Sequence, residues 1–292
     1  MGYQMSEIVE VEMYDTTIPE VFRSSDIIFH YTKASTALEK ILYDGFLRLA
    51  QRTDSGDPQE YRELELGSEF IVNDRVLAES IRAAGQEALK IIPRIISQNV
   101  RQICFCMNTN QVETGSPDIQ EEILIDQYGF FRPRMWSQYG DGHRGICLAF
   151  SRAELVKAIL ATKESEDRVF EGNIKYFQGF PGGYFIGAND AYKKGPEKYA
   201  QDYIEQIADG LLLTKHADYR DEYEYRISVV DNSGSLEWLP IANAIRGIIL
   251  GERFPDTYSC VVHEFEKQYR VPAVSILWER GTPCIIRYVE DQ

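Results

Sequence analysis

A series of short segments of strand length, separated irregularly by amphipathic helix patterns, constrains the fold of this chain more than any other feature. The expected strands are 26–32, 46–50, 101–108, 145–150, 168–177, 221–230, 236–241, 245–251, 274–280 and 283–289. A doubly wound parallel sheet would need strands and helices to alternate regularly. The irregular order instead predicts an α+β fold, in which helices pack on a mixed, mostly antiparallel β-sheet.

The chain is expected to form a single domain over residues 1–292. Its length and its 44% content of hydrophobic residues are enough for a large core. No internal repeat, low-complexity tract or Pro/Ser-rich linker divides it.

Helices are expected at 33–44, 69–99, about 192–213 and 256–269. Gly45 suits the C-terminal cap of the first helix, and Pro93 is expected to kink or divide the second. Ser151 and Glu154 have the spacing of a capping box, which predicts that a further helix begins directly after the strand 145–150.

The charge balance limits the class of partner. The 46 acidic and 31 basic residues give a net charge of −15, and such a field repels phosphate backbones, so duplex DNA is not expected to bind. A local basic pocket for a nucleotide remains compatible with this charge. The apolar runs are shorter than the roughly 20 residues of a membrane-spanning helix, and no secretory signal is visible at the N-terminus. We therefore expect a cytoplasmic protein.

The five cysteines are an odd number in a chain with no export signal, which favours reduced thiols over disulfides. Cys104 and Cys106 share one face of an expected strand, and small apolar core residues are the favoured interpretation. The four histidines are scattered, and no metal-binding motif, P-loop or serine-hydrolase motif is present. No metal site is predicted.

The stretch "DEYEYRISVV", residues 221–230, carries an unusual run of charge for a strand. Alternation places Glu222, Glu224 and Arg226 on one face, with the tyrosines and Ile227 on a packing stripe opposite. A solvated sheet edge would explain the charges. An active site would explain them equally, because two carboxylates can divide roles in a reaction that develops positive charge on carbon.

Two other segments carry groups suited to a ligand. In "FHYTK", His30 and Thr32 share one strand face, and a structural hydrogen bond is the alternative role for the histidine. In "RPRMWSQYGDGHRG", Trp136 and Tyr139 lie three residues apart, so both could stack on a planar ring if the segment is helical. Arg134 and Arg144 could supply local positive charge, whereas the alternative makes Trp136 a core residue and the arginines surface charges.

The order of these motifs resembles a bacterial family, domain of unknown function 2971. The resemblance covers most of residues 26–255 and rests on "FHYTKASTALEKILYDGFLRLA", "DPQE", "CFCMN", "MWSQYGDGHRGICLAF", "YRDEYEYRI" and "IRGIILGERF". The chain departs from the family at "SGDPQE", where an Asn usually precedes Asp-Pro. It also carries an N-terminal extension and inserts at about 61–100 and 178–214.

That pattern is in turn similar to the ADP-ribosyltransferase superfamily of the His-Tyr-Glu type. The similarity implies a split, mostly antiparallel two-sheet core with NAD in the cleft. Glu224 would be the catalytic residue that stabilises the oxocarbenium-like state, and Glu222 would orient or deprotonate the acceptor. His30, also assigned to the catalytic set, would hold the adenosine ribose. The remaining residues implied in NAD binding are Tyr31, Thr32, Trp136, Ser137, Tyr139 and Arg226. Tyr139 or Trp136 would stack on nicotinamide, and Arg226 could tether Glu222 or a phosphate.

The expected function is therefore an NAD-dependent ADP-ribosyltransferase or NAD glycohydrolase, acting as a bacterial toxin or anti-phage effector. A protein, a small molecule or a single-stranded nucleic acid could be the acceptor, and an antitoxin could be a partner. Two alternatives stay open: a non-catalytic domain that binds a nucleotide, and a magnesium-dependent nuclease that uses the carboxylates of Asp57, Glu60, Glu222 and Glu224.

Overall fold

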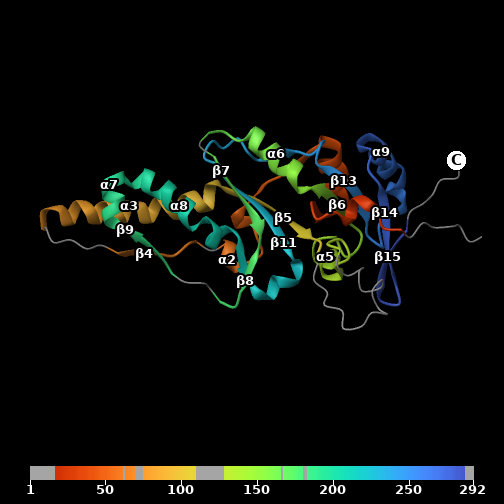
Figure 1. Ribbon diagram of the computed structural model, residues 1–292, viewed down its shortest axis with the longest axis horizontal. Coiled ribbons are helices and arrows are strands. Elements are labelled where there is room, and N and C mark those ends of the chain that lie inside the picture. The colour runs from red at the N-terminus through yellow and green to blue at the C-terminus, as the bar shows by residue number, and fades with distance from the viewer. Residues whose placement is uncertain are drawn as a thin grey trace, which may run out of the picture.

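The computed structural model describes residues 17–61, 63–69, 75–109, 128–165, 167–179 and 183–286. The described part of the molecule is elongated, with strands in the middle and helices at both ends (Figure 1). Most of the strands form one nine-stranded sheet in the order β15-β14-β13-β6-β1-β5-β11-β7, with β3 beside β5. In this sheet only the β13–β14 pair is parallel. The predicted mixed, mostly antiparallel sheet with helices is confirmed.

The strands of this sheet are β1 (Ile27–Thr32), β3 (Ala50–Gln51), β5 (Val100–Met107), β6 (Ile146–Ser151), β7 (Arg168–Asn173), β11 (Glu224–Val230), β13 (Ile245–Leu250), β14 (Ala273–Glu279) and β15 (Thr282–Ile286). Three small sheets pair β2 (Phe46–Arg48) with β12 (Trp238–Pro240), β4 (Leu66–Glu69) with β9 (Tyr184–Gly187), and β8 (Lys175–Phe177) with β10 (Thr214–His216).

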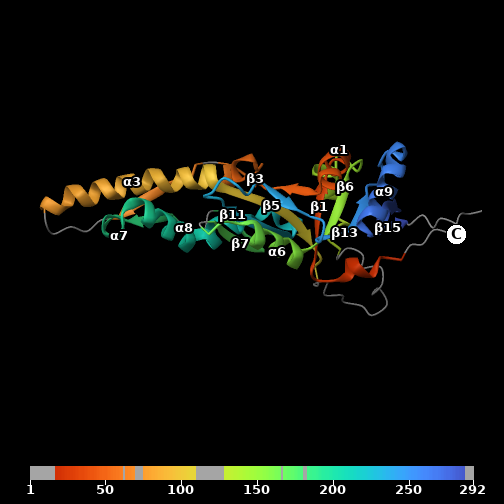
Figure 2. The ribbon, with the colours of Figure 1, turned by 90° about the horizontal axis from the view of Figure 1, so that it is seen from above.

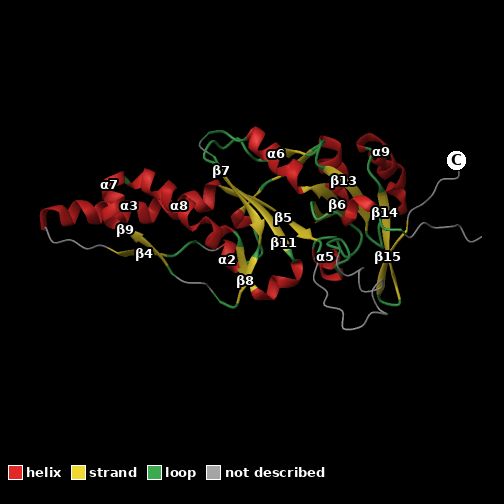
Figure 3. Ribbon diagram, viewed as in Figure 1, coloured by secondary structure: helices red, strands yellow, loops and turns green. Residues whose placement is uncertain are grey.

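The helices pack around these strands, as Figure 3 shows. They are α1 (Ala34–Thr36), α2 (Pro58–Tyr61), α3 (Arg75–Asn99), α5 (Pro133–Gln138), α6 (Arg152–Thr162), α7 (Ala188–Lys194), α8 (Pro196–Leu212) and α9 (Ser259–Tyr269). The 3-10 helices are η1 (Glu20–Arg23), η3 (Arg52–Asp54), η6 (Ala217–Glu222) and η7 (Asp256–Tyr258), and η2 (Ala37–Leu42) is a π-helix. No helix in the described ranges is long and apolar enough to cross a membrane.

The sheet is nearly divided between β1 and β5. Only two residue pairs join these strands, Ile28 with Met107 and Phe29 with Cys106. Beyond Phe29, β1 remains paired with β6 as far as Thr32, whereas the earlier part of β5 pairs with β3 and β11. The two strands therefore diverge directly after Phe29, and this divergence creates the space in which the candidate site lies.

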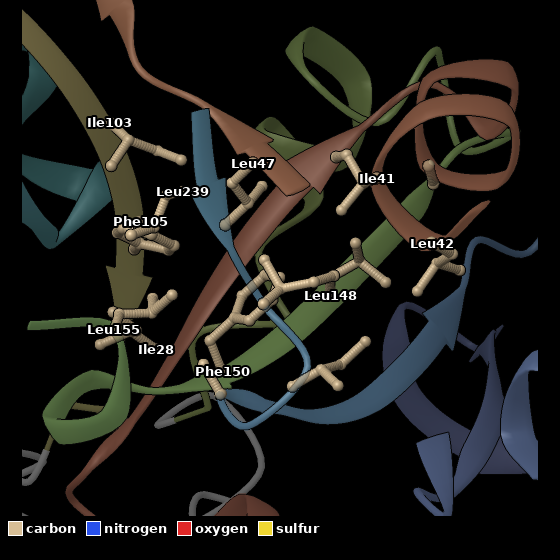
Figure 4. Packing of buried hydrophobic residues seen from close by; sticks show 14 of the residues in the cluster. Ile28, Ile41, Leu42, Leu47, Ile103, Phe105, Leu148, Phe150, Leu155 and Leu239 are labelled. Carbon is tan, nitrogen blue, oxygen red and sulfur yellow. The ribbon is translucent and has the colours of Figure 1, made fainter. Parts of the chain in front are cut away.

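The core is built by the two-residue period of the strands. Ile28, Phe105 and Phe150 pack on one face of the sheet, together with residues of η2 and α6 (Figure 4). Phe29, the residue after Ile28 in β1, packs on the opposite face with a second cluster that contains Trp136. Each central strand is thus fixed from both sides.

The two predicted inserts pack against each other. Helices α3, α7 and α8 form an arm at one end of the molecule, and the same arrangement is seen from above (Figures 1 and 2). The arm has its own apolar cluster, to which Ile92, Ile96 and Tyr203 contribute. The inserts therefore extend the domain sideways rather than interrupt its sheet.

Two helix predictions need correction. Pro93 does not divide the expected helix 69–99, because apolar residues before and after it are buried in the same cluster and hold α3 as one helix. The expected helix 192–213 is two helices, α7 and α8, because Gly195 adopts a φ of +83° and Pro196 starts a new helix. Residues 70–74 and 287–289, which were assigned to a helix and a strand, lie outside the described residues.

The cap prediction holds at Gly45, and at Ser151 it holds for the N-cap hydrogen bond. The reciprocal bond of a capping box is not formed, because the Ser151 N–H donates to the Ala244 carbonyl at 2.7 Å. Gly45 adopts a φ of +77°, and its N–H donates to the Ile41 carbonyl at 3.0 Å. The Ser151 hydroxyl accepts a hydrogen bond from the Glu154 N–H at 3.3 Å and donates to Asp26 at 2.6 Å. Ser151 therefore caps α6 while it links the helix to the start of β1.

Ser151→Ala is expected to lower the free energy of unfolding by about 0.5–2 kcal/mol, because it removes this N-cap. Urea denaturation measures the change. Ser97→Ala, within α3, is the matched control and is expected to stay within about 0.5 kcal/mol of wild type, since Ser97 bonds only to the Arg94 carbonyl. Equal losses in the two variants would contradict the capping role.

Candidate functional site

A cavity of about 290 Å³ lies at the divergence of β1 and β5. This size is close to the lower end of small-molecule pockets, roughly 300 Å³. Its lining residues are Phe29, His30, Tyr31, Arg48, Ala50, Gln51, Asp54, Ser55, Gly56, Glu60, Gln102, Ile103, Cys104, Phe105, Cys106, Met135, Tyr139, Lys215, Glu222 and Glu224. An imidazole from early in the chain and two carboxylates from late in the chain therefore face one cavity.

Glu224 is the first residue of β11, and it is 3% exposed. Its Oε1 accepts from Arg226 Nε at 2.6 Å, and its Oε2 accepts from Lys215 Nζ at 3.2 Å. Burial opposes ionisation of this carboxyl, but Arg226 and Lys215 outweigh burial and lower its pKa. Glu224 is therefore a fixed carboxylate anion at neutral pH.

Glu222 lies at the end of η6 and is also buried. Its Oε2 accepts from Lys215 Nζ at 2.7 Å, and its Oε1 accepts from the Tyr139 hydroxyl at 3.3 Å. The expectation that Glu222 shares a strand with Glu224 is wrong, because Tyr223 adopts a left-handed φ of 44° and ends η6 directly before β11. The two carboxylates still meet, since Lys215 contacts both.

The solvated-edge interpretation of residues 221–230 is also wrong. β11 lies between β5 and β7, inside the sheet, and Glu224 and Arg226 are buried. Tyr223 was expected in the packing stripe, but it is 42% exposed because it belongs to the turn. The stripe begins at Tyr225 and continues through Ile227 and Val229.

Lys215 is the site residue that the sequence prediction missed. It lies in β10, is buried, and places Nζ 4.5 Å from the centre of the Tyr219 ring. Burial opposes its charge, but Glu224 and Glu222 outweigh burial and raise its pKa above the usual lysine value. The only available signal was a lysine seven and nine residues before two acids, which is no recognised motif.

Arg226 has no exposed surface and cannot contact a phosphate, which corrects its predicted role. Besides Glu224, it contacts Glu60 Oε1 at 2.5 Å and the Leu212 carbonyl at 2.9 Å. Glu60, on α2, also accepts from Gln102 Nε2 at 3.1 Å. Arg226 therefore anchors the carboxylate of Glu224 and links it to Glu60 of the "DPQE" segment.

His30 follows Phe29 at the point of divergence. Its Nδ1 lies 3.0 Å from the Cys104 carbonyl, so Nδ1 carries the proton and Nε2 is left as an acceptor. Burial lowers the pKa of the imidazole, although this hydrogen bond opposes the effect. His30 is therefore neutral at pH 7 and can accept a hydrogen bond from a ligand hydroxyl.

Of the predicted aromatic residues, Tyr139 reaches the cavity and Trp136 does not. Trp136 is fully buried, and its Nε1 donates to the Phe130 carbonyl at 2.7 Å. The two rings separate although the Tyr139 N–H still donates to the Met135 carbonyl at 2.8 Å, because Trp136 packs inward against Tyr31, with ring centroids 5.0 Å apart. Tyr139 is 44% exposed, which leaves its ring available at the cavity.

Five further residues were assigned to ligand binding or to local positive charge, and the structure corrects or reduces the role of each. Thr32 and Ser137 do not line the cavity, because Thr32 lies at the far end of β1 and Ser137 is exposed on α5. Tyr31 lines it, but its hydroxyl donates to the Gly129 carbonyl at 2.7 Å. Arg134 and Arg144 do not reach the cavity either, so the buried positive charge there comes from Lys215.

Cys104 and Cys106 line the cavity rather than only filling the core. Burial raises the pKa of both thiols, so neither is an activated nucleophile. In the ranges that the structure describes, no group of three or more His, Cys, Asp or Glu residues could hold a metal ion. Asp57, assigned to the nuclease alternative, does not line the cavity.

The fold and the cavity define a mixed α/β protein whose main sheet diverges around a cavity lined by two buried carboxylates. Residues 135–227 match the family described as Protein of unknown function (DUF2971). The match confirms the predicted resemblance to this family, and it includes Tyr139, Lys215, Glu222 and Glu224. Neither the curated proteins nor the solved structures gave a match.

Proposed function

We propose that the cavity binds NAD and that the protein is an NAD-consuming ADP-ribosyltransferase or NAD glycohydrolase with an ADP-ribosyltransferase-like fold. One observation carries the proposal: His30, Glu222 and Glu224 line the same cavity where the two halves of the sheet diverge. NAD exceeds a cavity of about 290 Å³, so the nicotinamide and the hydroxyls of the two riboses would enter, and the adenine would extend outward.

The chemistry follows from the charges. Departure of nicotinamide leaves positive charge on the ribose carbon, and a fixed anion stabilises that charge. Glu224, ionised and buried, would accept a hydrogen bond from the ribose 2-hydroxyl and supply this stabilisation. Neutral His30 would accept from the other ribose through Nε2, and the Tyr139 ring would stack on nicotinamide.

Glu222 would act on the acceptor. Its hydrogen bonds to Lys215 and Tyr139 hold it beside Glu224, where it can orient a hydroxyl or amine for attack on the ribose carbon. The acceptor class stays a protein, a small molecule or a single-stranded nucleic acid. Loss of NAD or modification of a macromolecule would suit a bacterial toxin or anti-phage effector.

The first experiment incubates the purified chain with NAD, with magnesium or with EDTA, and measures nicotinamide release by chromatography. Release that EDTA leaves unchanged is the expected result. Both oxygens of Glu224 already accept hydrogen bonds, an observation that favours a non-catalytic nucleotide-binding domain as the second candidate. NAD binding without nicotinamide release would select that candidate, and metal-dependent cleavage of RNA or DNA would select the nuclease.

His30→Ala is expected to weaken NAD binding by about tenfold, because it removes one ligand hydrogen bond. Isothermal titration calorimetry measures the affinity. His263→Ala is the matched control, since His263 lies on α9 and does not line this cavity. Unchanged affinity in His30→Ala would count against the assigned role.

A further inference from the structure

The two carboxylates of the pocket share one buried cation. Lys215 Nζ lies 2.7 Å from Glu222 Oε2 and 3.2 Å from Glu224 Oε2, and all three side chains are buried. Across the described residues, no other cation lies within ion-pair distance of Glu222. Glu224 has a second partner in Arg226, but Arg226 is shared with Glu60.

Two buried carboxylates without a cation between them cannot both stay ionised, because their like charges repel in a medium of low dielectric constant. One of them would then take up a proton. The proposed reaction needs Glu224 as an anion and Glu222 free to accept a proton from the acceptor. Both requirements depend on keeping the pair doubly ionised.

We propose that Lys215 is a positioning residue for the NAD reaction: its ammonium group bridges Glu222 and Glu224 and holds both carboxylates, ionised, on the wall of the pocket. This inference rests on the proposed function. Lys215 acts through the two glutamates, and it is not assigned a contact with NAD.

Other titratable or charged groups surround the two carboxylates. They are Tyr139, Tyr176, Tyr219, Cys104, Cys106, His30, Glu60, Arg132 and Arg226. Burial raises the pKa of Tyr139, Tyr176 and both cysteines, so these groups stay protonated between pH 5 and 8. The pKa of His30 is lowered by burial, and this cause is the same in wild type and in a Lys215 variant.

The test compares the dependence of kcat/KM on pH in wild type and in Lys215→Met, which keeps the length of the side chain but removes its charge. The acid limb of the variant is expected to move upward by about 1–3 pH units, because the pair then retains a proton. Lys175→Met, on the neighbouring strand β8, is the matched control, since Lys175 is exposed and pairs with Thr214. A uniform fall in kcat with no movement of the acid limb would show a merely structural role and overturn the proposal.

A second measurement does not depend on NAD activity. In Lys215→Met the folded-state pKa of the carboxylate pair rises above its unfolded value, so the variant loses stability as pH rises through that raised pKa. Its urea midpoint is therefore expected to fall further below wild type at pH 8 than at pH 5. An equal deficit at both pH values would overturn the electrostatic role of Lys215. Absence of nicotinamide release by wild type would instead overturn the proposed function, whatever the stability measurements give.

Discussion

Glu224→Gln is expected to lower the rate of nicotinamide release from NAD by at least about 100-fold. Loss of one preorganised electrostatic group at the developing charge costs this much in well-studied enzymes. Glutamine is isosteric, and its amide oxygen can still accept from Arg226 Nε. Its NH2 group then faces the Lys215 ammonium, which donates to Oε2 at 3.2 Å in the wild type, so the melting temperature of the variant is measured as well. The negative charge that stabilises the oxocarbenium-like state is lost.

Glu222→Gln is the matched control for this change. Both substitutions remove one buried negative charge beside Lys215 Nζ. Glu224→Gln also weakens the ion pair with Arg226, so the melting temperatures of the two variants are compared alongside their activities. Because Glu222 is assigned to the acceptor, its loss is expected to reduce transfer of ADP-ribose more than hydrolysis of NAD by water. Chromatography measures nicotinamide release, and mass spectrometry measures the transferred ADP-ribose.

The assignment of Glu224 fails under one clear outcome. A Glu224→Gln chain that melts like wild type and consumes NAD at the wild-type rate would remove the residue from the catalytic role. A chain that melts at a much lower temperature than Glu222→Gln would show instead that the loss of activity reflects folding.

Most strands of the nine-stranded sheet could be predicted from the sequence, because they are short apolar runs with a local pattern. The short strands β4, β9 and β10 lack such a run of sufficient length and were not predicted. The placement of His30 and Glu224 around one cavity could be expected only through the resemblance to a family, since it depends on which strands pair. Lys215 carries no recognised local motif. It contacts the two glutamates because η6, a 3-10 helix, reverses the chain between them, and the two-residue pattern of 221–230 predicted a strand there instead. Trp136 misled because a three-residue spacing does not show whether a ring packs into the core, as Trp136 does, or reaches the cavity, as Tyr139 does.

The ion pair between Arg226 and Glu60 also could not be predicted from the local sequence pattern. The strand pattern placed Arg226 beside Glu224, which the structure retains, but the second carboxylate comes from α2, in a segment for which no helix was predicted. Only the folded sheet brings α2 against β11. The buried position of Arg226 therefore could not be separated from an exposed, phosphate-binding one by sequence alone.

Arg226→Met is expected to lower the free energy of unfolding by about 3–5 kcal/mol, the cost of removing one partner from a buried ion pair. The guanidinium contacts Glu224 at 2.6 Å and Glu60 at 2.5 Å, and without it both carboxylates stay buried with less compensation. Urea denaturation at pH 7 measures the loss. Arg168→Met, on the adjacent strand β7, is the matched control, because Arg168 forms a partly exposed pair with Glu205 and its loss should cost no more than about 1 kcal/mol.

The pH dependence of the Arg226→Met variant separates lost charge compensation from lost packing. In wild type, Arg226 and Lys215 lower the pKa of Glu224, so this carboxylate contributes stability that is present above its unfolded pKa and is lost as pH falls through the lowered folded value. Without Arg226 the buried carboxylates favour protonation, and the deficit relative to wild type should shrink as pH falls from 7 to 5. Adding Glu60→Gln to Arg226→Met should restore part of the stability at pH 7, since one uncompensated charge is removed. A deficit under 1 kcal/mol, or one that is constant with pH and unaffected by Glu60→Gln, would mean that packing rather than charge compensation is the main contribution of Arg226.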